Sequence, residues 1–262
     1  MKTALSIAGS DSSGGAGIQA DLKTFQATGT FGMTAITAIT AQNTLGVQAS
    51  EIVSPELLEA QIRSVCDDIR PDAVKIGMVG NADSIRCIAR LIQDYQLKNI
   101  VLDPVMVATS GASLLASDQV QSLQEDLIPL AKVITPNLSE TSVLYGQEVT
   151  DEASMEEAAK ALSDRYQVAV LIKGGHLKGK AWDVLADTNG LHWLQAAHID
   201  NPNTHGTGCT LSSAIASYLA QGYPLKEAIQ KAKVYLTGAI AAGLDLGHGH
   251  GPLNHAYRYQ KN

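Results

Sequence analysis

The stretch ALSIAGSDSSGGAGIQAD, residues 4–21, decides the class of the fold because it joins a strand to a helix through a glycine-rich turn. Residues 4–8 form an apolar run of strand length, and Ile18, Leu22 and Phe25 then recur at the spacing of one helix face. A strand that leads directly into a helix is the first half of a β–α–β unit, from which parallel sheets are built. The turn between them is GSDSSGGAG, residues 9–17, and its residues alone do not decide whether it binds a nucleotide.

The same alternation continues along the chain. Further strands are expected at residues 33–40, 73–78, 100–103, 133–135 and 168–173, with helices between most of them. One helix opens at Pro55, and two more are expected over residues 207–221 and 225–242, separated by Gly222-Tyr223-Pro224. Asn189-Gly190 indicates a hairpin within residues 181–194. We therefore expect an α/β fold of three layers, with a mostly parallel central sheet, helices on both faces, and one domain over residues 1–262.

Composition and charge exclude several classes of protein. With 262 residues, 45% of them hydrophobic, the chain can bury a full core. Its three cysteines are too few and too scattered for a disulfide framework or a paired metal site. The net charge of −7 argues against broad binding to nucleic acid or anionic lipid, both of which require a basic face. No apolar run reaches the roughly 18 residues of a membrane helix, and the apolar stretch at the start is too short for a secretory signal. We expect a cytoplasmic protein that binds a small molecule, with neither nucleic acid nor a membrane as its partner.

The opening turn matches neither common nucleotide-binding template. Gly9 and Gly14 have the spacing of a P-loop, but Gly15-Ala16 follow where a lysine and a hydroxyl residue are required. Residues 15–20 match G-x-G-x-x-G/A, yet the acidic residue about 20 positions further on, which would bind a ribose, is missing. Two interpretations remain open: the bare backbone lets a small polar ligand approach closely, or the glycines serve only the geometry of the connection.

A second glycine cluster, Gly206-Thr207-Gly208-Cys209, stands at the start of the helix expected over residues 207–221. Unpaired amide groups converge at a helix start and the helix dipole adds positive charge, so a phosphoryl group in transfer could be held there. Cys209 would lie in the first turn, where we expect its thiol pKa to fall from about 8.5 toward neutrality, so that it can take a proton from a substrate hydroxyl. Cys66 and Cys87 are expected to be buried and unreactive.

Three charged residues stand at the ends of consecutive expected strands, the edge at which open α/β sheets bind ligands. Asp103 and Glu140 are candidate Mg²⁺ ligands, directly or through water, because Mg²⁺ is held by one or two carboxylates together with substrate phosphate. Lys173 could neutralise phosphate charge. Each also has a structural alternative: Asp103 caps a turn before Pro104, Glu140 is a first-turn helix acid, and Lys173 is solvated.

The histidines do not add a metal site to this pattern. His176, His192, His198 and His255 lack a partner at metal-ligand spacing. The segment His248-Gly249-His250-Gly251 is too short and too rich in glycine to fix ligand geometry without support. We expect it to form a mobile lid or a terminal loop.

Taken together, these motifs resemble the ribokinase-like superfamily, and within it the bacterial hydroxymethylpyrimidine/phosphomethylpyrimidine kinases of thiamine biosynthesis. The resemblance runs nearly from end to end, through residues 8–21, 40–44, 75–78, 102–106, 134–140, 173–176 and 204–210. It implies ATP-dependent phosphorylation of the hydroxymethyl group of 4-amino-5-hydroxymethyl-2-methylpyrimidine, and then of the monophosphate at the same site. ATP and Mg²⁺ are the implied cofactors, and a homodimer is the expected assembly.

The resemblance also implies roles for single residues. Cys209 stands where most of the superfamily has an aspartate base, and Gly206, Thr207 and Gly208 complete the anion hole. The residues that resemble a pyrimidine site are Ala16, Asp21, Gln42, Met78 and Val105, with Gln42 paired to the ring edge. Asn137 and Glu140 resemble the N-x-x-E metal motif, with Asp103 as a second metal ligand, and the residues implied on the nucleotide side are Asn137, Lys173, Thr204 and Lys233. On this interpretation the opening turn helps to build the pocket for the alcohol.

Two alternatives stay open. A pyridoxine kinase of the same fold phosphorylates a similar hydroxymethyl ring, and Gln42 is the residue that we expect to discriminate between the two substrates. A non-catalytic pyrimidine- or nucleotide-binding protein would share the fold without the activity. The combination of Cys209, Lys173, Asp103 and Glu140 favours an enzyme.

Overall fold

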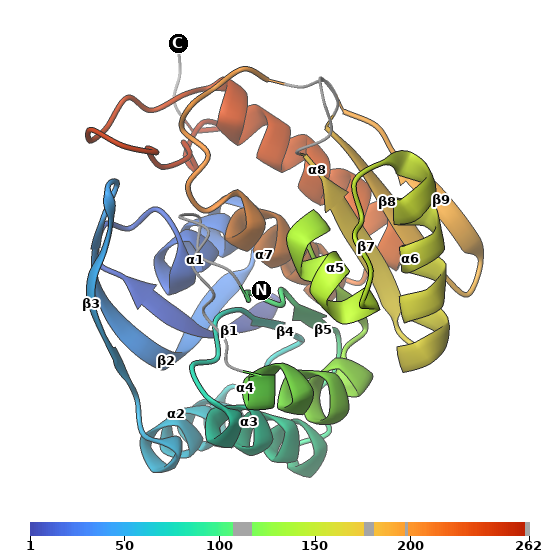
Figure 1. Ribbon diagram of the computed structural model, residues 1–262. Helices are drawn as coiled ribbons and strands as arrows, with labels where there is room; N and C mark the ends of the chain where they lie inside the picture. Colours follow the sequence, from blue (N-terminus) through green and yellow to red (C-terminus); the bar gives the residue numbers. More distant parts are fainter. Residues whose placement is uncertain (107–116, 176–180, 197–198, 260–262) are drawn as a thin grey trace.

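The computed structural model describes residues 1–106, 117–175, 181–196 and 199–259. In this part of the chain, nine strands form one sheet in the order β3-β2-β1-β4-β5-β6-β7-β8-β9 (Figure 1). Their bounds are β1 Thr3–Asp11, β2 Phe31–Asn43, β3 Gly46–Ile52, β4 Ala73–Ile76, β5 Ile100–Leu102, β6 Val133–Ile134, β7 Ala169–Gly174, β8 Trp182–Asp187 and β9 Gly190–Leu194. The strands from β2 to β7 in this order pair in parallel, whereas β3 at one edge and β8 and β9 at the other pair antiparallel.

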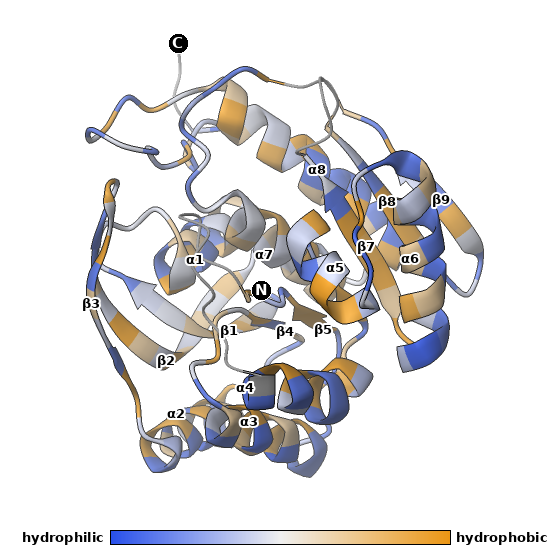
Figure 2. Ribbon diagram, viewed as in Figure 1, coloured by the Kyte–Doolittle hydropathy of each residue, from blue (hydrophilic) through white to orange (hydrophobic). Residues whose placement is uncertain are grey.

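Helices cover both faces of the sheet. One face carries α1 (Gly17–Ala27), α7 (Thr207–Ala220) and α8 (Leu225–Ala241). The other carries α2 (Pro55–Asp68), α3 (Ala82–Asp94), α4 (Ser117–Ser122), α5 (Leu138–Tyr145) and α6 (Glu152–Tyr166), with a π-type segment Leu123–Leu127 and a 3₁₀ turn Ile128–Leu130 after α4. Because successive strand residues point to opposite faces, Leu5 and Ile7 join one core cluster and Ala4 the other. Figure 2 shows hydrophobic residues on the central strands and hydrophilic ones on the outer sides of the helices. The expected three-layer α/β fold is confirmed.

The expected strands and closing helices are also confirmed, with three differences in detail. The sequence does not predict β3, whose side chains are almost all exposed, so that no core selects an apolar pattern in it. Asp187 pairs with Gly190 across the β8–β9 hairpin, so the turn residues are Thr188-Asn189 and lie one position before the expected dipeptide. Leu22 is 37% exposed, although a Cβ atom added to Gly32 of β2 would lie 2.7 Å from its Cδ2 atom, and Ile18 and Phe25 are the buried residues of the expected helix face.

The two helices that follow the glycine clusters begin differently from most others. The helices α2, α3, α5 and α6 each start after a residue whose side chain accepts a first-turn N–H: Ser54, Asn81, Asn137 and Asp151. The residues before α1 and α7 are Ala16 and Gly206, and neither makes a side-chain hydrogen bond to its helix. The first amide groups of α1 and α7 are therefore left for partners outside the helix.

A buried ion pair joins the sheet to two helices of one face. Asp21 of α1 and Lys75 of β4 lie 2.8 Å apart, and neither side chain has exposed surface. The Asp21 carboxylate also accepts hydrogen bonds from Ser6 Oγ of β1 and Ser213 Oγ of α7, each at 2.5 Å. Since a buried charge is tolerated only when it is paired and hydrogen-bonded, these contacts fix the positions of β1, β4, α1 and α7 relative to one another.

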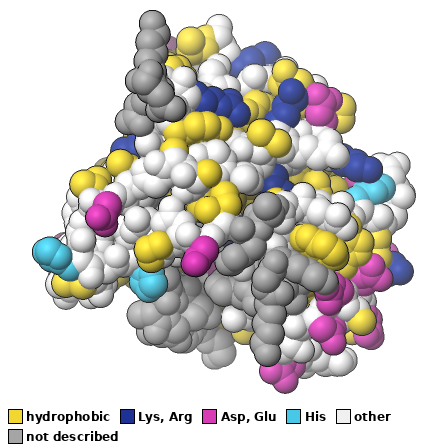
Figure 3. Space-filling view, turned by 90° about the horizontal axis from the view of Figure 1, so that it is seen from above, with side chains coloured by type: hydrophobic (Ala, Val, Ile, Leu, Met, Phe, Trp, Pro, Cys, Tyr) yellow, Lys and Arg dark blue, Asp and Glu magenta, His cyan; other side chains and the backbone are white. Residues whose placement is uncertain are grey.

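Two surface features bear on possible partners. Within the described residues, no helix is both long and apolar enough to cross a membrane. Among the described side chains on the face shown in Figure 3, acidic and basic groups are interspersed with hydrophobic ones, and no broad basic patch is visible. Large apolar side chains are exposed on and between β2 and β3: Phe31, Ile39, Leu45, Val47 and Ile52.

Replacing Lys75 by Met should leave the Asp21 carboxylate buried without its counter-charge, and should lower the free energy of unfolding by about 3–5 kcal/mol. The matched control is Lys2→Met, which removes a half-exposed lysine 2.7 Å from Asp72 and should cost less than about 1 kcal/mol. Urea unfolding followed by circular dichroism measures both values. Equal losses in the two variants would contradict the structural role of the buried pair.

Candidate active site

The carboxyl ends of the parallel strands bring most of the predicted site residues to one edge of the sheet. β1 ends at Asp11, Asp103 directly follows β5, and Lys173 is the next-to-last residue of β7. Asn137, which follows β6, forms an isolated parallel β-bridge with Lys173. The helix α7 packs across β4 and β5, so the second glycine cluster reaches the same edge.

An ion pair stands directly beside the second glycine cluster. Lys173 Nζ lies 2.8 Å from Asp103 Oδ1, which also accepts a hydrogen bond from Thr135 Oγ1 at 3.2 Å. A Cβ atom added to Gly208 would lie 3.2 Å from Asp103 Oδ2 and 3.3 Å from Lys173 Nζ. The aspartate, the lysine and the start of α7 therefore form one cluster, as the sequence predicts. Lys173 is not a free, solvated lysine, because its ammonium is paired and largely buried.

Glu140 is the first-turn helix acid that the sequence left as one alternative, and its other alternative, a Mg²⁺ ligand, stays a prediction. Its backbone N–H donates to Asn137 Oδ1 at 2.9 Å, and its Oε2 accepts from the Asn137 N–H at 2.8 Å, so the two residues form the capping box of α5. Burial raises the pKa of Glu140 to about 7, although the charge of Lys173 lowers it, and Asp103 raises it further. The carboxyl is thus buried within the field of the Asp103–Lys173 pair.

Cys209 lies in the first turn of α7, as expected, but the expected fall in its pKa is wrong. Burial raises the pKa of its thiol, the nearby Lys75 lowers it, and the carboxylates of Asp21 and Asp103 raise it. Desolvation therefore outweighs both the helix start and the buried lysine. Cys66 and Cys87 are buried, as expected, and burial raises the pKa of each thiol.

The two glycine turns lie in direct contact. Gly206 has a φ of +84°, and a Cβ atom on it would overlap the carbonyl oxygen of Gly15. A Cβ atom on Gly15 would in turn overlap the His205 ring. Glycine is required at both positions for the backbones to approach, so the opening turn and the second cluster form one structural unit.

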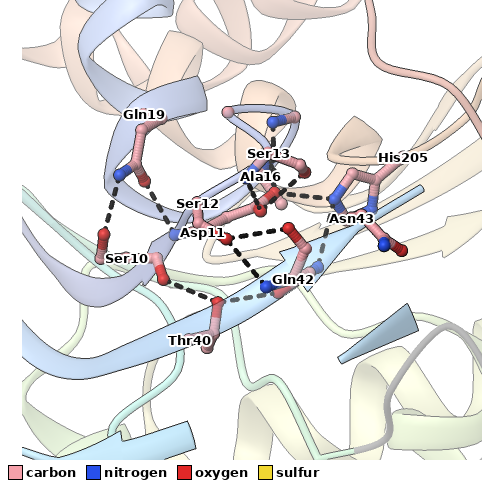
Figure 4. A network of polar contacts seen from close by, with 12 residues as sticks. Ser10, Asp11, Ser12, Ser13, Ala16, Gln19, Thr40, Gln42, Asn43 and His205 are labelled. Carbon is pink, nitrogen blue, oxygen red and sulfur yellow. Dashed lines mark hydrogen bonds and ion pairs between the residues drawn. The ribbon is translucent and has the colours of Figure 1, made fainter. Parts of the chain in front are cut away.

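Asp11 organises the opening turn and connects it to the second cluster (Figure 4). Its Oδ1 accepts from Ser13 N at 2.8 Å and Ser13 Oγ at 2.7 Å, and its Oδ2 accepts from Gly15 N at 3.1 Å and Ala16 N at 2.8 Å. His205 Nε2 lies 2.8 Å from the same Oδ2. Burial raises the pKa of Asp11, but the hydrogen bonds from His205, Ser13 and Ala16 outweigh it and hold the pKa well below its usual range.

Sequence reasoning did not single out Asp11 or His205 as site residues. The only local signal is the aspartate two residues before Ser13, a spacing typical of side-chain turns.

The residues expected in the substrate pocket lie around this unit, with one exception. Gln42 ends near His205, with its Nε2 atom 3.3 Å from His205 Nε2, and Ala16 is the cap of α1. Met78 packs against Gly9, where a Cβ atom would come within 2.8 Å of Met78 Cε, and the Val105 N–H donates to the Asp103 carbonyl. Asp21 is the exception. Its carboxylate is fully buried and already has three partners, so it offers no free surface to a ligand in this conformation, and its place in a pyrimidine site stays a prediction.

Residues expected on the nucleotide side are less closely grouped. Lys233 of α8 pairs with Asp183 and donates to the carbonyl of Ala181 at 2.8 Å, so its ammonium anchors β8. Thr204 is exposed, and its carbonyl accepts from the Thr207 N–H at 3.3 Å. The roles of both residues beside a nucleotide stay predictions.

The histidines outside the motifs are dispersed. Burial lowers the pKa of His255 to about 4, and its Nε2 lies 2.9 Å from Thr210 Oγ1. In the segment expected as a lid or terminal loop, the N–H groups of His248 and Gly249 contact Thr44 Oγ1, each at 3.2 Å. His176 and His198 lie outside the described residues. Within the described part of the chain, no three His, Cys, Asp or Glu residues group as a metal centre.

Comparisons with known proteins agree on one family. The model of a family described as phosphomethylpyrimidine kinase matches residues 11–254. The hydroxymethylpyrimidine/phosphomethylpyrimidine kinase of Rhizobium meliloti is 53% identical over 263 residues, which cover 99% of this chain and 98% of that protein. The thiamine biosynthesis bifunctional protein ThiED of Geobacter sulfurreducens is 49% identical over 96% of this chain and 51% of its own length. The crystal structure of an ADP complex of Bacillus subtilis pyridoxal kinase matches with a TM-score of 0.93 and 44% identity over 100% of both chains.

Replacing Gly206 by Ala should separate the two glycine turns, because the added methyl group meets backbone and not a flexible side chain. The matched control is Gly222→Ala, which also has a positive φ of +93° but open space around its Cβ position, and which should cost only the backbone strain of about 1–3 kcal/mol. Urea unfolding and nucleotide binding are measured for both. We expect Gly206→Ala to lose more stability than its control and also to lose nucleotide affinity. A loss of stability no greater than that of Gly222→Ala, with nucleotide affinity unchanged, would show that the close contact is dispensable.

Proposed function

Because the chain belongs to the phosphomethylpyrimidine kinase family, we propose that the cluster at the carboxyl edge of its sheet performs the phosphoryl transfer of that family. The protein is an ATP-dependent kinase of thiamine biosynthesis. It phosphorylates 4-amino-5-hydroxymethyl-2-methylpyrimidine and then the monophosphate. The observation that carries the assignment to this site is the uncapped start of α7, with Gly208 directly beside the Asp103–Lys173 pair.

The start of α7 serves as the anion hole for the phosphoryl group in transfer. The amide groups of Gly206 and Gly208 have no side-chain cap, so they can donate to phosphate oxygens as negative charge develops. The Thr207 N–H can join them by exchanging its 3.3 Å hydrogen bond to the Thr204 carbonyl for one to phosphate. Lys173 adds a full positive charge next to them. Its present partner Asp103 keeps this ammonium charged and in place, since burial lowers the pKa of Lys173 but the two nearby carboxylates raise it above its usual range.

Cys209 is the group that receives the proton of the substrate hydroxyl. The hydroxyl oxygen attacks the γ-phosphorus of ATP, its proton passes to Sγ, and ADP leaves with the bridging oxygen. Only the thiolate can accept this proton, and Lys75 is the buried cation that favours the thiolate against the cost of burial. The buried pair of Lys75 and Asp21 therefore acts on the site through the charge of Lys75 near Cys209, and it does not contact the substrate.

Mg²⁺ would be held by Asp103 and Glu140, directly or through water, together with phosphate oxygens of the nucleotide. The residues fit such an ion: both offer hard carboxylate oxygens and both are buried at the same edge of the sheet. Bound Mg²⁺ supplies charge neutralisation of the phosphates. Asn137 positions Glu140 through the capping box of α5.

The alcohol substrate would lie against the joined glycine turns, beside the end of β2. Gln42, Ala16, Met78 and Val105 are its proposed contacts, and Thr204 and Lys233 remain candidates on the nucleotide side. Pyridoxine is the competing substrate, because a pyridoxal kinase shares this fold. A homodimer, which would cover the apolar side chains exposed on and between β2 and β3, a cytoplasmic location and a single domain over residues 1–262 complete the proposal.

The function is tested by ADP formation with three alcohols: the aminopyrimidine, its monophosphate and pyridoxine. We expect turnover of the first two, and we expect Cys209→Ala to lower kcat by about 10²–10⁴ while ATP binding survives, the usual range for a positioned base. Cys87→Ala, which removes a buried thiol outside the glycine cluster, is the control and should keep normal kcat. Near-normal turnover by Cys209→Ala would remove the cysteine from the mechanism. Faster turnover of pyridoxine than of the aminopyrimidine would identify pyridoxine as the substrate instead.

Glu140→Gln should raise the Mg²⁺ concentration needed for half-maximal rate. Glutamine keeps an oxygen that can accept from the Asn137 N–H, so the capping box persists and only the charge is lost. Rates are measured across a Mg²⁺ titration at saturating ATP and alcohol. Asp151→Asn, which removes a carboxylate charge from the capping box of another helix, α6, is the control. An unchanged Mg²⁺ requirement in Glu140→Gln would refute its assignment as a ligand.

A further inference from the structure

The donors around Asp11 determine which hydrogen bond His205 makes. Two backbone N–H groups, those of Gly15 and Ala16, already point at Asp11 Oδ2, so this oxygen can act only as an acceptor. His205 Nε2, 2.8 Å away, must therefore carry a proton and donate it to the carboxylate. This conclusion holds for neutral and for charged histidine, because Nε2 is protonated in both cases.

A donating His205 Nε2 constrains the amide of Gln42. In the conformation drawn in Figure 4, Gln42 Nε2 lies 3.3 Å from His205 Nε2, but a protonated Nε2 has no lone pair with which to accept from it. A half-turn of the amide exchanges its oxygen and nitrogen and puts Oε1 there, where it can share the His205 N–H as a second, longer acceptor beside Asp11. The hydrogen-bonding groups around Gln42 thus favour the turned amide.

Thr40 favours the same turned amide from its other side. Thr40 Oγ1 lies 2.9 Å from the Ser10 carbonyl and 3.2 Å from the amide atom of Gln42 that faces it. A hydroxyl has a single proton, and the nearer carbonyl takes it, so Thr40 Oγ1 can only accept from Gln42. It accepts well from an N–H, which the turned amide provides. The backbone of Gln42 is held in place by Ser12 Oγ, which accepts from its N–H and donates to its carbonyl, both at 2.8 Å.

We propose that Asp11, His205 and Thr40 are positioning residues that fix the direction of the Gln42 amide, with Oε1 on the His205 side and Nε2 on the Thr40 side. Gln42 is partly exposed, so one lone pair and one N–H remain for a ligand in a defined order. The ring edge that fits has a donor on the His205 side and an acceptor on the Thr40 side. An exocyclic amine next to a ring nitrogen has this order, and the inference therefore rests on the proposed aminopyrimidine substrate.

The order of donor and acceptor provides a sharp test. The 4-oxo analogue, 5-hydroxymethyl-2-methylpyrimidin-4(3H)-one, has nearly the same shape as the aminopyrimidine but a carbonyl in place of the amine and an N–H in place of the ring nitrogen. If the Gln42 amide is fixed, the carbonyl of the analogue faces Gln42 Oε1 and its ring N–H faces Gln42 Nε2. An acceptor then meets an acceptor, and a donor meets a donor. The wild-type protein should prefer the aminopyrimidine by at least about tenfold in Kd and in kcat/KM, because each mispaired polar group costs about 1–3 kcal/mol.

The preference is measured in variants on both sides of the amide. His205→Leu removes the donor and should reduce the preference to about threefold or less, whereas His205→Gln can still donate to Asp11 and should retain most of it. Thr40→Val removes the acceptor without changing shape and should also reduce the preference, with Thr40→Ser as its matched control. A general loss of pocket structure would instead weaken both ligands equally.

Three outcomes would overturn the inference: a wild-type protein that does not distinguish the two analogues, a preference that survives in both His205→Leu and Thr40→Val, or an equal loss for both ligands in every variant. Binding and turnover separate this inference from the proposed function. Failure of the wild-type protein to phosphorylate the aminopyrimidine would refute the function, and the inference with it. Normal phosphorylation with an unchanged preference in the variants would refute the inference alone.

Discussion

The contact between the backbones of Gly15 and Gly206 is the constraint on which the site depends. It brings the turn after the first strand against the start of α7, with no room for a side chain on either residue. This approach brings together the uncapped start of α7, the Asp11 turn, and Gln42 at the end of β2 beside His205. The glycines of the opening stretch therefore allow the two turns to meet, and in the proposed function they border the substrate.

The charges of the site are arranged in two buried pairs with different surroundings. Asp21 and Lys75 are sealed in the interior, where they hold the sheet to two helices and bring a positive charge near Cys209. Asp103 and Lys173 lie at the strand ends, beside the glycine cluster and Glu140. Since an unpaired buried charge is destabilising, the pairing allows the protein to bury four charged side chains near one another. The Asp21–Lys75 pair is a structural support, and in the proposed function the Asp103–Lys173 pair lies beside the transferred phosphate.

Much of the fold and part of the site could be predicted from the sequence. The alternation of strands and helices gives the three-layer architecture, and the strand-end positions of Asp103 and Lys173 predict their meeting because parallel strands end at one edge. The extent to which individual side chains are buried could not be predicted. Asp21 turns inward because Lys75 and Ser213 approach from elements distant in sequence, and Cys209 is desolvated by the same packing. The exposed strand β3 lacks a core pattern, and local sequence gives no sign that His205 meets Asp11.

The separation of Asp11 and His205 along the chain has a consequence for the order in which the protein is assembled. Asp11 and His205 are 194 positions apart in the sequence, yet they form a direct hydrogen bond with each other. During synthesis β1 and its turn are made long before the donor that completes the hydrogen bonds of the Asp11 carboxylate, because 194 positions separate the two residues. Contacts of such long range form late because the intervening chain must first be ordered. A nascent chain that stops before α7 therefore contains all nine described strands of the sheet but lacks Cys209 and the first amides of α7, so the proposed catalytic site is complete only once α7 has been made.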